Sequence, residues 1–136
     1  MVKHIAFLLL CFSIACFNTV NAQTADDYIN RGIAKNDLKD YRGAIQDYNK
    51  AIEINPKDEV AYYFRGIAKN RLEDYRGAIQ DYNKAIEINP KIAQVYYFRG
   101  LAKIYLGDEN GGCLDFSKAG ELGDKDIYDT IKRYCN

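Results

Sequence analysis

The sequence predicts an all-α solenoid, in which consecutive helix hairpins stack along one axis and a short helix closes the C-terminal end. The main evidence is an internal repeat: the block DYRGAIQDYNKAIEINPK occupies residues 40–57 and recurs unchanged at residues 74–91. Laying residues 27–60 over residues 61–94 without a gap gives 26 identical positions out of 34. A fixed period of this length is typical of stacked supersecondary units, and the apolar residues within each unit recur at helical spacing.

The first 22 residues are expected to be a secretory signal peptide rather than part of the fold. They begin with basic residues, continue with an apolar run over residues 5–17, and end in small or medium residues at 20–22, which is the usual order in such peptides. We therefore expect an exported protein, periplasmic or secreted, cleaved after Ala22. A lipoprotein anchored through Cys16 is a minor alternative, because the residues before this cysteine lack the usual leucine.

The composition of the remaining chain argues against several classes of function. Without Lys3 the chain has 18 basic and 19 acidic residues and no block of like charge, so nothing indicates a nucleic-acid partner. The apolar run at residues 5–17 is too short for an integral membrane span. His4 is the only histidine and leaves with the signal peptide. Neither a cysteine nor a serine nucleophile then has a histidine base, and no zinc site is expected. We predict no enzyme and no cofactor.

Each repeat unit is predicted to form two antiparallel helices. In the second unit, residues 60–72 form the first helix and Leu72, Glu73 and Asp74 form the turn. Asp74 can cap the second helix, which ends at Asn89 because the residue before a proline avoids the α region. A third and looser copy follows at residues 95–128, and residues 126–134 are predicted to form a short amphipathic helix.

These units resemble the tetratricopeptide repeat (TPR). The matching residues are Tyr28, Gly32, Ala34, Ala44, Tyr48, Ala51 and Pro56 in the first unit; Tyr62, Gly66, Ala68, Ala78, Tyr82, Ala85 and Pro90 in the second; and Tyr96, Gly100, Ala102, Phe116 and Ala119 in the third. The third unit departs from the pattern at Gly112 and at Asp124, which replaces proline. The resemblance implies a right-handed superhelical solenoid of three TPR hairpins and a capping helix. The boundaries would be 25–58, 59–92, 93–125 for a degenerate third repeat, and 126–136 for the cap.

Charged residues replace apolar ones at two positions of every unit. The family usually has leucine and tyrosine where this chain has Arg31, Arg65 and Arg99, and Lys35, Lys69 and Lys103. Each arginine has an aspartate at one fixed offset, namely Asp47, Asp81 and Asp115. An ion pair between the two helices of each hairpin would explain this pattern. Solvated charges that never meet are the alternative.

The two cysteines of the expected mature chain flank a predicted turn. Cys113 lies eleven residues before Asp124 and Cys135 lies eleven residues after it. An antiparallel hairpin that turns near Asp124 would place the two cysteines side by side. An exported chain permits a disulfide there, and two separate thiols are the alternative.

In the family, the first helices of successive hairpins line a concave groove that accepts segments of other proteins. The matching positions here are Tyr63, Phe64, Ile67, Asn70, Arg71, Tyr97, Phe98, Leu101, Ile104 and Tyr105. Relatives that grip a C-terminal carboxylate have Asn and Lys or Arg at such positions, so the mostly aromatic and aliphatic set argues against that clamp. For Phe64 and Phe98 especially, packing between repeats is the alternative to binding.

Two functions are consistent with this pattern. The first is an exported scaffold that binds a partner peptide or protein in the aromatic and aliphatic groove. The second is a self-associating module of an envelope complex, in which a homo-oligomer forms through the inner surface.

Overall fold

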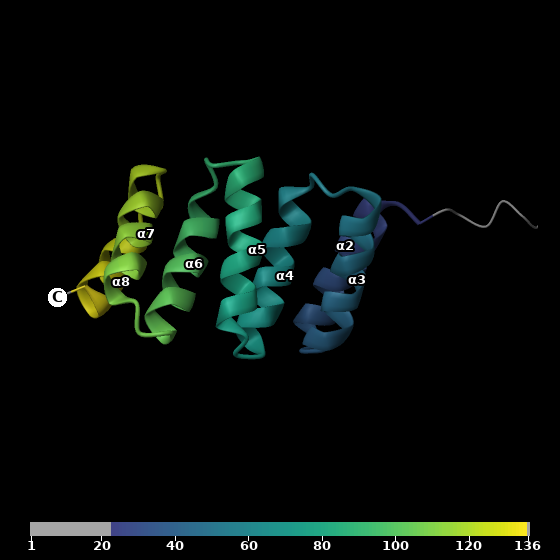
Figure 1. Cartoon of the computed structure of the whole chain (residues 1–136), viewed down its shortest axis with the longest axis horizontal. Helices are drawn as coiled ribbons and strands as arrows, with labels where there is room; N and C mark the ends of the chain where they lie inside the picture. The colour runs from purple at the N-terminus through teal and green to yellow at the C-terminus, as the bar shows by residue number, and fades with distance from the viewer. Residues whose placement is uncertain (1–22, 136) are drawn as a thin grey trace, which may run out of the picture.

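The computed structural model describes residues 23–135, so the predicted signal peptide lies outside the described residues. This range contains seven α-helices and no strand: α2 (Ala25–Asp37), α3 (Tyr41–Ile54), α4 (Glu59–Arg71), α5 (Tyr75–Ile88), α6 (Ala93–Tyr105), α7 (Glu109–Glu121) and α8 (Ile127–Tyr134). They follow one another along the long axis of the molecule (Figure 1). None of these helices is long and apolar enough to cross a membrane.

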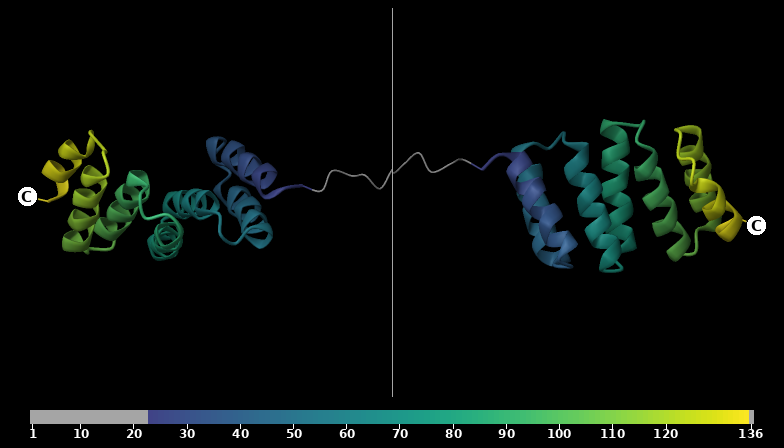
Figure 2. Two further views of the ribbon diagram at one scale, coloured as in Figure 1. Left: turned by 90° about the horizontal axis from the view of Figure 1, so that it is seen from above. Right: turned by 180° about the vertical axis from the view of Figure 1, so that it is seen from behind.

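The helices form three hairpins, α2–α3, α4–α5 and α6–α7, and α8 packs against α7. Each hairpin also packs on the next, because α3 contacts α4 and α5 contacts α6. The two further views show the paired helices stepping along the chain with α8 at the far end (Figure 2). The predicted fold, a right-handed superhelical solenoid with a short capping helix, is confirmed.

Local signals in the sequence set the ends of the helices. Asp40, Asp74 and Asp108 cap α3, α5 and α7, since each carboxylate accepts a hydrogen bond from the backbone N–H three residues later. Such caps satisfy backbone donors that the first helical turn leaves free. The predicted cap at Asp74 and the predicted end of the helix at Asn89 are thus confirmed.

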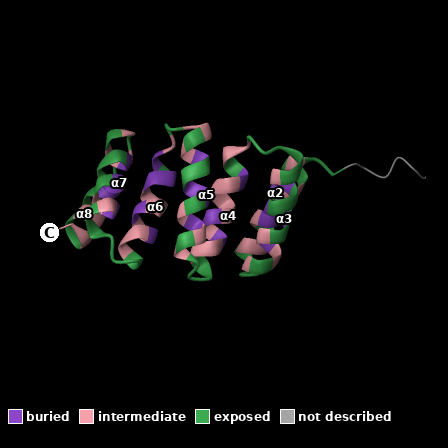
Figure 3. Cartoon of the chain, viewed as in Figure 1, coloured by how far each residue is buried: buried purple, intermediate pink, exposed green. Residues whose placement is uncertain are grey.

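The core lies along the contacts within and between hairpins (Figure 3). Within the second hairpin, a Cβ added at Gly66 would lie 2.6 Å from Cε1 of Tyr82, and Tyr82 itself has no exposed surface. The small residue therefore lets the aromatic ring of the facing helix lie against the backbone of α4. Ala85 is also fully buried and contacts Val95 of the next hairpin, as expected for the residue that admits the following helix.

Candidate functional site

A cleft of about 510 Å³ lies between α4 and α6 on the predicted groove face. Seven of the predicted groove residues line it: Ile67, Asn70, Arg71, Tyr97, Phe98, Leu101 and Tyr105. Two further lining residues, Glu73 and Tyr75, come from the turn after α4 and the start of α5. We refer to this space as the α4–α6 cleft.

The other three predicted groove residues contribute to packing instead. Tyr63 packs against the core of Ala78, Tyr82, Ala85 and Val95, and burial raises its pKa. Phe64 contacts the buried cluster of the first hairpin and stacks on Tyr48, with 6.1 Å between ring centroids. Ile104 packs beside Gly112 of α7. These side chains support the cleft from behind rather than line it.

Phe98 and Tyr97 belong to both the cleft and the core. Phe98 packs against the core of the second hairpin and Tyr97 packs against that of the third. They are part of an unbroken series of ring contacts, each 5.1–6.1 Å between centroids, that runs through Tyr48, Phe64, Tyr63, Phe98, Tyr97, Phe116 and Tyr134. Aromatic pairs at such distances stabilise one another, so rings that line the cleft are also packed into the core.

Polar groups border the apolar wall of the α4–α6 cleft. The Asn70 Nδ2 donates to the Tyr82 hydroxyl at 2.9 Å, and the Asn70 Oδ1 is buried without a hydrogen-bond partner. Arg71 and Glu73 are both exposed, and no ion pair of either is found within residues 23–135. The cleft therefore offers one cation and one anion that nothing in the described chain neutralises by direct contact.

A stacked tyrosine pair closes the end of the cleft near Arg71. The rings of Tyr75 and Tyr105 are 5.1 Å apart with an interplanar angle of 21°, although 58% of Tyr105 is exposed. Tyr75 is not among the predicted groove residues, because it lies in the second helix of its hairpin and the groove was predicted from first helices. The offset between Tyr75 and Arg71, across a three-residue turn, is the signal that could have placed it beside the groove.

A second cleft, of about 790 Å³, lies beside the first. The start of α6 forms one side of it, through residues 91–94, and the α7–α8 turn with Asp126 and Thr130 forms the other. Tyr97 and Phe98 line this α6–α8 cleft as well as the α4–α6 cleft. The two clefts are thus neighbours that share one aromatic wall.

The predicted ion pairs between the helices of each hairpin are confirmed. Arg65 binds both carboxylate oxygens of Asp81, at 2.9 Å and 2.6 Å, and Lys69 binds the same carboxylate at 2.8 Å. The third hairpin repeats this arrangement with Arg99, Asp115 and Lys103, and the first with Arg31, Asp47 and Lys35. The hydrogen bond from Arg31 is the main cause that lowers the pKa of Asp47.

The arginines of the second and third hairpins also reach the preceding repeat. Arg65 donates to the Asn49 Oδ1 and Arg99 to the Asn83 Oδ1, both at 2.8 Å. Each arginine further lies over a tyrosine one turn earlier in its own helix, 4.9–5.5 Å from the ring centroid. These arginines are bound by neighbouring side chains within and between the hairpins. They differ in this respect from Arg71 and Glu73 in the cleft.

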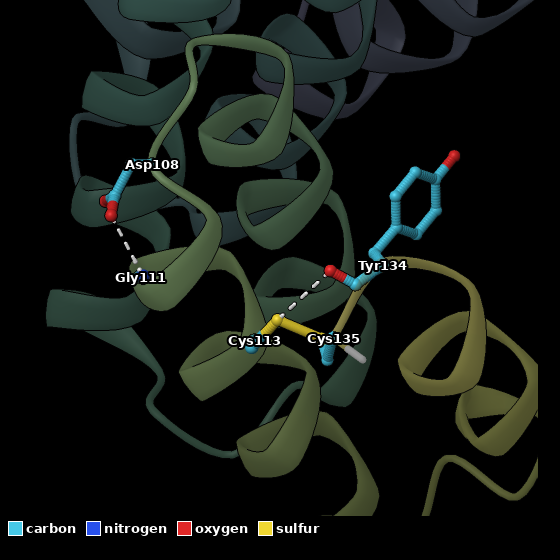
Figure 4. The surroundings of a disulfide bond; sticks show 5 residues. All are labelled: Asp108, Gly111, Cys113, Tyr134 and Cys135. Carbon is cyan, nitrogen blue, oxygen red and sulfur yellow. Dashed lines mark hydrogen bonds between the residues drawn. A yellow bond between two sulfur atoms is a disulfide. The ribbon is translucent and has the colours of Figure 1, made fainter.

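The predicted cysteine pair lies at the C-terminal end, where Cys113 and Cys135 form a disulfide with their Cα atoms 5.7 Å apart. Cys113 is in α7 and Cys135 directly follows α8, while the ring of Tyr134 points away from the sulfurs (Figure 4). No group of three or more histidine, cysteine or acidic residues that could hold a metal ion occurs in the described part of the chain.

Comparisons with known proteins agree with this architecture. The family model of the tetratricopeptide repeat matches residues 25–58 and 60–92. A search of curated proteins found no match to the chain. Among solved structures, the TPR domain of Arabidopsis OM64 has a TM-score of 0.80 at 27% identity, over 82% of this chain and 94% of that one.

Two TPR domains of Spaghetti (RPAP3), each bound to the HSP90 peptide SRMEEVD, are also similar. The second has a TM-score of 0.72 at 25% identity, over 75% of this chain and 94% of that one. The first has a TM-score of 0.79 at 24% identity, over 85% and 93%. Residues 25–58 and 60–92 are therefore two tetratricopeptide repeats, and the chain has the fold of a TPR domain.

Proposed function

We propose that this chain is a binding module whose α4–α6 cleft receives an extended segment of a partner protein. The observation that carries the proposal is the cleft itself: an apolar wall of Ile67, Phe98 and Leu101, flanked by a cation and an anion that take no ion pair in the described chain. Large apolar side chains of a partner bind best in such pockets, where well-packed walls exclude water.

The similar structures support this class of function. The second TPR domain of RPAP3, 25% identical to this chain, is bound to a peptide of HSP90. A TPR fold that takes up a short peptide of another protein is therefore found at this level of similarity. The ligand chemistry here is expected to differ, because aromatic and aliphatic residues predominate on this groove face.

The cleft defines the chemistry of the segment we propose. A phenylalanine or leucine of the partner would lie against Phe98 and Leu101, beside the stacked rings of Tyr75 and Tyr105. Opposite charges attract across a partly desolvated site and mainly set specificity. An acidic residue next to the anchor would therefore meet Arg71, and a basic residue next to it would meet Glu73.

An array of synthetic heptapeptides tests the proposal with the full chain. Each peptide carries Phe, Leu, Ser or Lys at its centre, flanked by an acidic residue on one side and a basic residue on the other. We expect binding only with the apolar centres, and Tyr105→Ala is expected to weaken it by about tenfold because a hot-spot truncation costs more than about 1 kcal/mol.

Tyr128→Ala provides the matched control. Tyr128 is an exposed tyrosine like Tyr105, with 76% of its surface accessible, but it lines neither cleft. Equal losses for the two variants, or equal binding of Phe-centred and Ser-centred peptides, would contradict the proposal. Light scattering on the same samples addresses the second candidate, since a concentration-dependent dimer that excludes the peptides would favour self-association.

We further propose that the chain acts after export, in the periplasm or outside the cell. The order of residues in 1–22 supports this, as does the disulfide, because disulfides persist mainly in oxidising compartments. Mass spectrometry of the protein from its native host should find an N-terminus at Gln23. A chain that retains residues 1–22, or one cut before a lipidated Cys16, would contradict cleavage after Ala22.

A further inference from the structure

The C-terminal helix α8 forms one wall of the α6–α8 cleft. Asp126, at the start of α8, and Thr130 in its middle face residues 91–94 across this space. Tyr97 and Phe98 line this space too, and they also line the α4–α6 cleft. A peptide that crosses these two rings from the first cleft therefore enters a space that exists only while α8 is in place.

The attachment of α8 to the solenoid is slight. The helix has eight residues, its N-terminus has no side-chain cap, and Ile127 is its only buried residue. Helices of this length are unstable alone in water, so α8 depends on its contacts. Its noncovalent packing is made by Ile127, Ile131 and Tyr134 against the buried cluster around Phe116.

The disulfide supplies the other attachment, and it lies at the far end of α8 from the α7–α8 turn. It joins Cys113 in α7 to Cys135, the residue after α8. Chain connectivity through the turn at Gly123 holds the start of the helix. The sulfur bridge, shown in Figure 4, holds its end. Both cysteines are only partly buried, so a small reductant can reach them.

Tyr134 connects the end of α8 to the α4–α6 cleft. Its ring lies 6.1 Å from that of Phe116, and its hydroxyl lies close enough to Tyr105 to raise the pKa of that residue through their electrostatic interaction. Tyr105 in turn stacks on Tyr75 in the wall of the first cleft. Displacement of α8 would thus remove one cleft and withdraw a support from the other.

We infer that the Cys113–Cys135 disulfide is a redox-controlled latch: it keeps α8 docked and the two clefts joined, and its reduction releases α8 and weakens peptide binding. The inferred release of α8 depends only on the contacts that hold this helix to the solenoid. The effect on peptide affinity rests on the proposed function.

The reductant is a dithiol. One thiolate of the dithiol attacks a sulfur of the protein disulfide, breaks the Cys113–Cys135 bond and forms a mixed disulfide. The second thiolate of the reductant then attacks that mixed disulfide and closes the oxidised reductant. Two electrons pass from the dithiol to the protein, and the two cysteines take up two protons to become thiols.

Hydrogen–deuterium exchange on the full chain tests the latch without any ligand. The oxidised protein, the protein in dithiothreitol and the Cys113→Ser, Cys135→Ser double variant are compared. We expect the amides of α8 to exchange faster by about tenfold or more in the two bridge-free samples, because local opening becomes easier. The amides of α4 and α5 should keep their rates, and reoxidation should restore α8. Unchanged exchange in α8, or acceleration spread over all helices, overturns the latch.

The Phe-centred heptapeptide is the probe for the coupling to binding. Its affinity is expected to fall by about fivefold or more on reduction, a typical size for coupling between sites. When the Phe-centred peptide is extended at the end nearest α8, Thr130→Ala should weaken its binding. The same variant should leave hydrogen–deuterium exchange in α8 unchanged. An affinity that stays constant while α8 loses protection refutes the coupling. Failure of the peptide to bind in either redox state contradicts the proposed function instead, and the exchange data still decide the latch.

Discussion

The second and third hairpins share one layer of contacts and differ in another. Both hold their two helices together with the same charged set, in which an arginine and a lysine bind one buried aspartate. Beneath the groove they differ: the second hairpin pairs Asn70 with Tyr82, while the third has Ile104 and Phe116 at the same two positions. Both positions of the pair therefore differ between the two hairpins: one pair is hydrogen-bonded and the other is apolar.

This difference shows which parts of a repeat can vary separately. The charged set spans the two helices of one hairpin, and its arginine and its lysine both depend on one aspartate. The pair under the groove is local, and it can be exchanged as a unit without moving the helices. The pair under the groove can therefore differ between repeats while the charged set that joins the helices stays the same.

Removal of a central aspartate should have the largest effect. Asp81→Ala leaves Arg65 and Lys69, each only about one-fifth exposed, without their carboxylate. Breaking a buried ion pair from one side costs about 3 kcal/mol or more, because a buried charge is left uncompensated. Urea unfolding monitored by circular dichroism measures the loss.

The matched control for this prediction is Asp47→Ala in the first hairpin. Arg31 is 45% exposed, and within residues 23–135 no asparagine binds it as Asn49 binds Arg65, so water can solvate it once Asp47 is gone. We expect a loss of about half that for Asp81→Ala, since exposed pairs contribute little. Equal losses in the two variants would show that the deeper burial of the charged set in the second hairpin has no effect on the free energy lost.

The ion pairs within the hairpins and the disulfide could be predicted from the sequence, each for a physical reason. The fixed offset from Arg65 to Asp81 recurs in all three units, and a repeated offset across a hairpin fixes which helical faces meet. The disulfide could be predicted because the turn near Asp124 lies midway between its cysteines. Both depend only on the path of the backbone.

The composition of the cleft could be predicted less completely, because it depends on side-chain direction. Tyr63 and Ile104 lie on the expected helices, yet their side chains pack inward. Glu73 and Tyr75 line the cleft from a turn and a second helix, which a pattern of first-helix positions does not include. The α6–α8 cleft was not anticipated, since it requires the angle at which α8 lies on α7.

A smaller effect is expected where the third hairpin has glycine in place of alanine. A Cβ at Gly112 would lie 2.7 Å from Cδ1 of Ile104 and 2.9 Å from the carbonyl oxygen of Gly100. Gly112→Ala should therefore cost about 2 kcal/mol, as overpacking of a core does. The second hairpin has alanine at this position, Ala78, but Asn70 where the third has Ile104.

A double-mutant cycle decides whether the isoleucine is the cause. In the Ile104→Ala background, Gly112→Ala should cost about 1 kcal/mol less than it does alone, since contacting residues couple by this amount. Thermal or urea unfolding of the four proteins gives the cycle. Strictly additive losses would assign the clash to the Gly100 backbone rather than to Ile104.

Substitutions in the pair under the groove, Asn70 and Tyr82, should have a still smaller effect on stability. Tyr82→Phe leaves the Asn70 amide without its acceptor and is expected to cost about 1 kcal/mol. Adding Asn70→Ile should restore most of that, because the third hairpin packs the apolar pair at the same place. Tyr48→Phe is the control: the Tyr48 hydroxyl is buried without a partner, so its removal should leave stability unchanged or raise it. A loss at Tyr48 equal to that at Tyr82 would contradict the importance of the hydrogen bond.

The smallest expected effect lies in the turns between the helices of each hairpin. Lys39 and Glu73 have φ of 62° there, whereas the third hairpin has Gly107 with φ of 86°. A residue with a side chain pays about 1 kcal/mol in this left-handed region, and glycine offsets part of the gain through its freer unfolded chain. Lys39→Gly should therefore raise the stability by less than about 1 kcal/mol, while Gly107→Ala should lower it by a similar amount. Thermal unfolding measures both, and Lys39 suits the test because it lines neither cleft. If Lys39→Gly destabilises the protein, the side chains of Lys39 and Glu73 stabilise the first two turns by more than the strain costs. The third hairpin, with Gly107, lacks that stabilisation.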